Sequence, residues 1–213
     1  MDEVRRGDWF QTYPSRTKFY ILDPRPEDIN IRDIAHSLAL KCRYGGHCAY
    51  FYSVAEHSVL LSHVVPGHLA LAALLHDAAE TYTGDIMRPI KESIGDEWRV
   101  VEAQLDAVIC DQLGVNLESL HDPLIKEYDS RILTDERDVL QAPPLPGKNY
   151  GDALHVAIRA LTWQDAESEF LARYDELMKR HPVTKPAQIT EHLDLQQEME
   201  STPIPQFLKE RAV

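Results

Sequence analysis

A histidine and two acidic residues lie together in the middle of the chain, at the end of an apolar, alanine-rich run. That run, residues 69–75, leads directly into His76 and Asp77, and Glu80 follows one helical turn later. On a helix, the three side chains crowd one end of one face. Their burial is costly unless a cation offsets it, and imidazole and carboxylate groups are good ligands for divalent ions. A solvated helix end is the plain alternative for an isolated His-Asp pair.

Two further residues can reach the same point from other segments. The residues 53–56, Ser-Val-Ala-Glu, form a capping-box pattern, which predicts a helix that turns His57 inward with its apolar residues. Asp129 lies on or near the apolar side of a helix that is expected to open at Pro123, where a carboxylate needs a partner. An inward histidine is more often a hydrogen-bonded core residue. The combination is what predicts one cation held between three helices.

Apolar residues at helical spacing predict that helices position these groups. A two-stranded ribbon from residues 9–12 and 19–22 is expected before them. The expected helices start after Asn30, at Val54 and near Leu69, and then cover 97–113, a segment from Pro123, 153–160 and 163–179. Asp135 and Asp138, in a charged stretch, are expected to be solvated. Residues 142–147 form a break, either a lid or a surface loop.

Composition and charge limit the possible functions. The chain of 213 residues is long enough for one domain, expected over 1–182, and a peripheral tail over 183–213 with a helix near 189–199. Its net charge of −13 argues against a nucleic-acid duplex as partner but permits a small anion bound beside a metal and local cations. No signal-peptide pattern or membrane-length apolar run is present, and three cysteines read as reduced thiols, so a cytoplasmic protein is expected.

A glycine-containing connection lies upstream of the two histidines. It reads Lys41-Cys-Arg43-Tyr44-Gly-Gly-His47, and glycines let the backbone approach a ligand closely. The alternative is a plain turn that carries a solvated arginine. His47 and His36 are further candidates to line a pocket, and each has a structural role as its alternative.

The ordered set of motifs resembles the HD-domain phosphohydrolase superfamily. Over roughly residues 30–140, the matching motifs are Arg43-Tyr44, Val54-Ala-Glu-His57-Ser58, His76-Asp77-Ala-Ala-Glu80, Thr83-Gly-Asp85, Pro89-Ile-Lys91 and Asp129. They are similar to the bacterial 5′-deoxynucleotidase-like branch, which includes phage deoxynucleotide triphosphohydrolases. The sequence departs from the pattern of this branch at Tyr44, where other members carry tryptophan. A smaller and more pliable side chain in the wall of the substrate pocket would affect which base or sugar is accepted.

The resemblance implies an all-α helical bundle, one divalent metal ion (Mn, Co, Fe, Zn or Mg) and a water molecule that attacks phosphorus. The implied metal ligands are His57, His76, Asp77 and Asp129. The implied proton-transfer groups are Glu80 and Asp85. The implied substrate-binding groups are Arg43 and Lys91 for phosphate and Tyr44 for the sugar or base, and His47 is the further candidate for substrate binding. Because members of this family commonly form oligomers, a homo-oligomer is the expected assembly.

Three functions are compatible with these residues. The first is hydrolysis of a deoxynucleotide mono- or triphosphate by a metal-dependent enzyme. The second is hydrolysis of a cyclic nucleotide or (p)ppGpp, because the same ligand set serves those reactions. The third is a non-catalytic metal-binding sensor, against which the presence of Glu80 and Asp85 argues, since a sensor does not need them.

Overall fold

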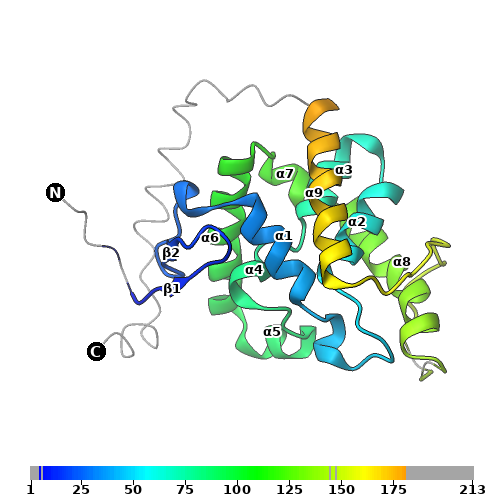
Figure 1. Cartoon of the computed structure of the whole chain (residues 1–213). Coiled ribbons are helices and arrows are strands. Elements are labelled where there is room, and N and C mark those ends of the chain that lie inside the picture. The colour runs from blue at the N-terminus through cyan, green and yellow to red at the C-terminus, as the bar shows by residue number, and fades with distance from the viewer. Residues whose placement is uncertain (1–4, 6, 144, 147, 181–213) are drawn as a thin grey trace.

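Helices are the main elements of the computed structural model, which describes residues 5, 7–143, 145, 146 and 148–180 (Figure 1). The helices are α1 (Ile31–Leu40), α2 (Val54–Val64), α3 (Ala70–Leu75), α4 (Glu80–Thr83), α5 (Arg88–Ile94), α6 (Asp96–Leu113), α7 (Leu117–Leu120), α8 (Pro123–Leu140) and α9 (Trp163–Arg180). Short 3-10 turns are η1 (Pro26–Asp28), η2 (Arg43–Gly46) and η3 (Gly67–Leu69). The predicted all-α fold is confirmed. The helix predicted near 189–199 lies outside the described residues.

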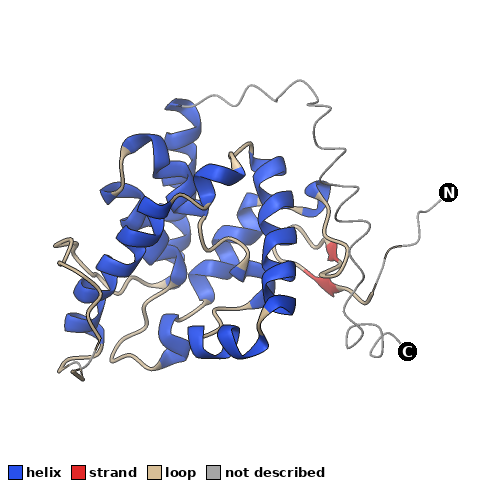
Figure 2. Cartoon of the chain, turned by 180° about the vertical axis from the view of Figure 1, so that it is seen from behind, coloured by secondary structure: helices blue, strands red, loops and turns tan. Residues whose placement is uncertain are grey.

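The ribbon is also confirmed, although it is shorter than predicted. Strands β1 (Phe10–Gln11) and β2 (Lys18–Phe19) pair antiparallel, with Phe10 opposite Phe19. Phe19 is fully buried and its ring stacks on Tyr82, which attaches the ribbon to the helical core. Figure 2 shows the two strands at one edge of the bundle, and α8 lies at the opposite edge.

Helix α2 is the centre of the bundle. It packs against α1, α3, α8 and α9, and every residue from Val54 to Val59 is buried. A helix enclosed on all sides can carry polar groups only where they have partners, and α2 carries Glu56 and His57. The predicted inward direction of His57 is therefore confirmed, because its side chain is fully buried.

Local sequence signals account for where several helices begin and end. The Asn30 side chain accepts a hydrogen bond from the Arg32 amide at the start of α1, and Ser53 accepts one from the Glu56 amide at the start of α2. Gly114 takes the left-handed conformation that ends α6. The second half of the predicted capping box is wrong, because the Glu56 carboxylate bonds elsewhere.

The helix predicted over residues 153–160 is wrong. This segment has no regular secondary structure, and the backbone amides of Arg159 and Leu161 donate to the Glu56 carboxylate at 2.9 and 2.8 Å. The Leu154 amide donates to Asp135 Oδ2 at 2.7 Å. Buried or partly buried carboxylates on α2 and α8 thus satisfy amides that a helix would have paired internally. Asp138 is exposed, as expected, whereas Asp135 holds this segment.

Within the described part of the chain, no helix has both the length and the apolar character needed to cross a lipid bilayer.

Candidate metal and phosphate site

The four predicted ligands come from three elements and meet at one point. His57 lies on α2, His76 and Asp77 follow α3, and Asp129 lies on α8. His57 Nε2 is 3.4 Å from His76 Nε2 and 3.2 Å from Asp129 Oδ1. One ligand atom each from these three residues lies within 4.8 Å of the other two. Asp77 Oδ2 completes the group, at 3.2 Å from His76 Nε2 and 3.9 Å from His57 Nε2.

The chain after α3 tightens where it delivers its two ligands. Helix α3 ends at Leu75, and the next residues keep right-handed helical dihedrals but change to hydrogen bonds three residues apart, beginning with Ala78 N to Leu75 O. Helix α4 then starts at Glu80, so the predicted continuous helix is in fact two helices joined by a tight turn. His76 and Asp77 lie within this turn, half-buried beside His57.

Each histidine is oriented through its other ring nitrogen. His76 Nδ1 lies 2.8 Å from the Ala73 carbonyl oxygen, and His57 Nδ1 lies 2.6 Å from Glu136 Oε1. Both oxygens can only accept, so both Nδ1 atoms carry the proton and both Nε2 atoms face the cluster. This is the arrangement in which metal-binding histidines are usually found. The donor set and its spacing therefore fit a divalent cation.

Glu136 is a central residue that the sequence interpretation missed. It lies on α8, is fully buried, and contacts His57, Arg43 and two tyrosine hydroxyls. Its position two helical turns after Asp129 places it on the same face as that ligand, and this spacing was the available signal. The charged residues around it concealed the signal, because such stretches are usually solvated.

Arg43 lies inside the cluster rather than in solvent. Its Nη1 donates to Asp77 Oδ2 at 3.3 Å, and its Nε is 3.4 Å from Glu136 Oε2. The side chain is 11% exposed, so the alternative of a solvated arginine is excluded. A buried guanidinium between two carboxylates is a cation that a bound phosphate can also contact.

The carboxylates around Arg43 and the histidines are held in the ionised form. Burial opposes this, but Arg43 and His57 lower the pKa of Glu136 to about 2. Burial likewise opposes ionisation of Asp129, and its contact with His57 lowers that pKa to about 2. Burial lowers the pKa of His76, but the Asp77 carboxylate beside it outweighs burial and raises the value to about 9.

A second group of acidic residues borders the cluster and shows the opposite behaviour. Burial, Asp77 and Asp85 together raise the pKa of Glu80 to about 9, and burial also raises the pKa of Asp85. Lys91 Nζ lies 3.5 Å from Glu80 Oε1 and 2.8 Å from Glu102 Oε1. The buried Glu80 Oε2 has no hydrogen-bond partner among the described residues. Glu80 thus favours the protonated form more than an ordinary carboxyl group does, and one of its oxygens has no partner among the described residues.

The remaining predicted residues lie at different distances from the cluster. Tyr44 is half-buried, and its hydroxyl donates to Glu136 Oε2 at 2.5 Å. His47 is exposed, with its backbone carbonyl bonded to Gln141, and its substrate-binding role stays a prediction. His36 contacts Glu167 at 2.9 Å and lies against the Trp163 ring, so it belongs to the packing between α1 and α9.

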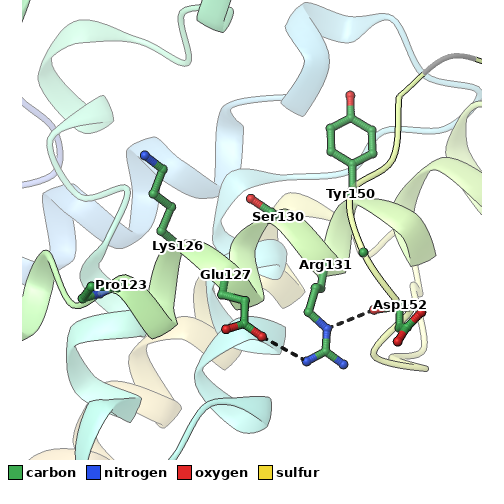
Figure 3. Close-up of a pocket in the computed structure, with 8 residues that line it drawn as sticks. Pro123, Lys126, Glu127, Ser130, Arg131, Tyr150 and Asp152 are labelled. Atoms are coloured by element: carbon green, nitrogen blue, oxygen red, sulfur yellow. Dashed lines mark hydrogen bonds and ion pairs between the residues drawn. The ribbon is translucent and has the colours of Figure 1, made fainter.

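A cavity of about 550 Å³ lies on the outer flank of α8 and is separate from the ligand cluster (Figure 3). Its wall includes Arg131, which donates to the Asp152 carbonyl at 3.0 Å and approaches Glu127 at 3.5 Å. The bond from Arg131 to Asp152 ties the segment after residue 148 to the helix. None of the predicted site residues lines this cavity.

Comparison with known proteins gives a consistent result. The family model described as "5′-deoxynucleotidase YfbR-like" matches residues 36–144. The chain is 42% identical over 119 residues to "Uncharacterized protein YfdR" of Escherichia coli K12, covering 56% of this chain and 65% of that protein. It is 40% identical over 115 residues to an uncharacterized protein of Rhodobacter capsulatus, covering 50% of this chain and 59% of that protein. It is 26% identical over 141 residues to a 5′-deoxynucleotidase of Cronobacter sakazakii, covering 62% and 68%. The chain therefore spans about three fifths of the length of the first two relatives.

Proposed function

The chain belongs to the YfbR-like 5′-deoxynucleotidase family of the HD-domain superfamily, and from this premise we propose that it hydrolyses the 5′-phosphate of 2′-deoxynucleotides with one divalent metal ion. The observation that carries the proposal is the convergence of two oriented imidazoles and two carboxylates on one point. Beside them lie a buried guanidinium and a proton-holding carboxyl group. Together they supply what a phosphate-cleaving site requires.

The metal would be held by His57, His76, Asp77 and Asp129. When bound, a divalent ion acts as a Lewis acid on a phosphoryl oxygen and lowers the pKa of a water molecule that it holds. Mixed nitrogen and oxygen donors suit Mn, Co, Fe, Zn or Mg, and the donor set alone does not choose among them.

The other side chains would bind and neutralise the phosphate and move protons. Arg43 has the planar fork that matches phosphate oxygens, and Lys91 adds a second cation from α5. Glu80 would exchange a proton with the attacking water or the leaving oxygen, as a positioned carboxyl group with a raised pKa can. Asp85 shares the electrostatic environment of Glu80 and would assist it.

The sugar preference is proposed from Tyr44. This ring follows the phosphate-binding Arg43 in the chain, and its hydroxyl is held by Glu136 rather than free in the site. A ring fixed in that way forms a close wall, and a close wall excludes a 2′-hydroxyl by shape. The 5′-deoxynucleotidase named among the relatives supports the same substrate class.

The test is a screen of matched deoxy- and ribonucleoside 5′-mono- and triphosphates, together with a cyclic nucleotide, on purified protein loaded with Mn²⁺, Co²⁺ or Mg²⁺. We expect that the protein releases phosphate from deoxynucleotides and that a metal chelator abolishes this release. Glu80→Gln, purified identically, controls for contaminating phosphatases. Equal rates for the two sugars would remove the deoxynucleotide preference. If the protein binds metal but hydrolyses none of these compounds, the proposal of an enzyme would be replaced by that of a metal-binding sensor.

A further inference from the structure

The Glu136 carboxylate has four partners that belong to two different parts of the site. Oε1 contacts His57 Nδ1 at 2.6 Å and the Tyr52 hydroxyl at 3.0 Å. Oε2 accepts from the Tyr44 hydroxyl at 2.5 Å and lies 3.4 Å from Arg43 Nε. A fully buried carboxylate is stable only when its lone pairs are satisfied, and here all partners are hydrogen-bond donors.

The Oε1 side sets the state of one candidate metal ligand. Because the carboxylate accepts from His57 Nδ1, the lone pair of the neutral imidazole is at Nε2, which faces His76 and Asp129. His57 lies in the fully buried first half of α2, so a changed ring orientation would have to displace packed neighbours. Carboxylates placed this way commonly determine the affinity of a histidine for its metal.

The Oε2 side holds the turn that carries the proposed phosphate and sugar contacts. Within η2, Tyr44 has φ 58° and ψ 22°, and Gly45 has φ 59° and ψ 27°. The left-handed conformation is unfavourable for a residue with a side chain, so Tyr44 keeps it only because contacts elsewhere fix the residue. The hydrogen bond from its hydroxyl to Glu136 is such a contact.

We propose that Glu136 is a positioning residue that joins the metal ligand His57 to the Arg43–Tyr44 turn, so that one buried carboxylate sets both metal affinity and substrate affinity. This inference rests on the proposed function for the roles of His57 and the turn. Glu136 touches neither metal nor substrate. It acts through the histidine on one side and through the tyrosine and arginine on the other.

The experiment uses the full chain with four substitutions. Glu136→Gln keeps the size of the side chain but removes its charge. Tyr44→Phe removes only the donor on the turn. Tyr52→Phe removes a buried donor to Glu136 Oε1 and leaves the contacts of Oε2 with the turn in place, so it is the comparison for Tyr44→Phe. Asp138→Asn, exposed on the same helix, is the matched control.

Each variant is measured in two ways. Mn²⁺ affinity is obtained by calorimetric titration of the metal-free protein, and KM and kcat are obtained at saturating metal. Glu136→Gln should weaken Mn²⁺ binding roughly 10–100-fold, the range for loss of such partners, and also raise KM. Tyr44→Phe should raise KM roughly 10-fold with near-normal Mn²⁺ affinity and kcat, as expected for a lost hydrogen bond to a charged group. Asp138→Asn should match the parent protein in both measurements, and Tyr52→Phe, which leaves the Oε2 contacts with the turn in place, should keep the parent KM.

The outcomes separate the inference from the proposed function. If the parent protein binds Mn²⁺ and Glu136→Gln binds it equally well with an unchanged KM, Glu136 does not position the site. If the parent protein binds no divalent ion, the proposed function itself fails. If Glu136→Gln does not fold, the two tyrosine variants decide: a raised KM in Tyr44→Phe alone supports the inference, and equal effects in both overturn it.

Discussion

Two neighbouring groups of carboxyl groups in this protein have pKa values that are shifted in opposite directions. The ligand side consists of His57, His76, Asp77, Asp129 and Glu136 around Arg43, and its carboxyl pKa values are lowered. The acidic side consists of Glu80, Asp85, Glu102 and Asp106 around Lys91, and the pKa values of Glu80, Asp85 and Asp106 are raised. Residue type and burial are similar on both sides, so another property must explain the difference.

The difference is the supply of cations and hydrogen-bond donors. On the ligand side, a guanidinium and two imidazoles contact the carboxylates directly. On the acidic side, Lys91 is shared between Glu80 and Glu102. Burial penalises a charged group in both places, and only the ligand side has enough partners to outweigh it. Under the proposed function, the ligand side would bind the cation, and the acidic side would exchange protons.

The largest expected effect comes from removing a ligand. Asp129→Ala should lose the divalent metal, measured by elemental analysis of the purified protein, and activity should fall on the order of a thousand-fold or more, because the metal supplies several kcal/mol to phosphoryl transfer. Asp138→Ala, exposed on the same helix, should keep both. Full metal content in Asp129→Ala together with its loss in Asp135→Ala would show that the fourth ligand is assigned to the wrong aspartate.

The next effect tests whether Glu80 belongs to the acidic side. Glu80→Gln should keep its metal while kcat falls by roughly two to four orders of magnitude, the range for general acid–base groups. The physical reason is that glutamine preserves the size of the side chain but cannot transfer a proton. Loss of metal from this variant would move Glu80 to the ligand side, and near-normal turnover would remove it from catalysis.

A smaller effect is expected from the shared cation of the acidic side. Lys91→Met should raise KM for a nucleotide roughly 10–100-fold, the equivalent of one lost hydrogen bond to a charged group, with metal content unchanged. Lys126→Met, an exposed lysine on the outer flank of α8, is the matched control. A KM that does not change in Lys91→Met would restrict Lys91 to its contacts with Glu80 and Glu102.

Repeating local signals made most of the fold predictable. Apolar spacing and Gly114 define α6, Asn30 caps α1, and Ser53 caps α2, because each signal acts within a few residues of the chain. The segment over 153–160 was misread because its structure depends on Glu56, about a hundred residues away. A local pattern contains no record of such a partner.

The candidate site likewise contains residues that could be predicted from local sequence and one that could not. The ligands could be proposed because imidazole and carboxylate groups on inward helix faces need a cation. The burial of Glu136 could not be predicted in the same way, because its partners come from η2, from α2 and from Tyr52, two residues before α2. Within its own helix the residue is one more charged side chain among Asp135, Arg137 and Asp138.

The smallest effect concerns stability and isolates the deficit of positive charge on the acidic side. Asp106 on α6 approaches His121 Nε2 at 3.4 Å and has a side chain that is 13% exposed. Burial and the nearby Glu102 carboxylate raise its pKa to about 7. In the unfolded chain the group ionises near its ordinary pKa of about 4, so between about pH 4 and pH 7 the unfolded state alone gains the charge. The folded protein therefore loses stability as the pH rises through this interval.

Asp106→Asn should remove that loss, because the amide is neutral in both states. The full shift corresponds to at most about 4 kcal/mol, and access of water to the side chain reduces it, so we expect a gain of about 2 kcal/mol, or about 4–8 °C in Tm for a chain of this size. The gain should be present at pH 8 and nearly absent at pH 4, measured by thermal unfolding of the metal-free protein. Asp111→Asn, exposed on the same helix, should show no gain at either pH. A variant that is stabilised equally at both pH values would mean that packing, rather than the missing cation, distinguishes the two sides.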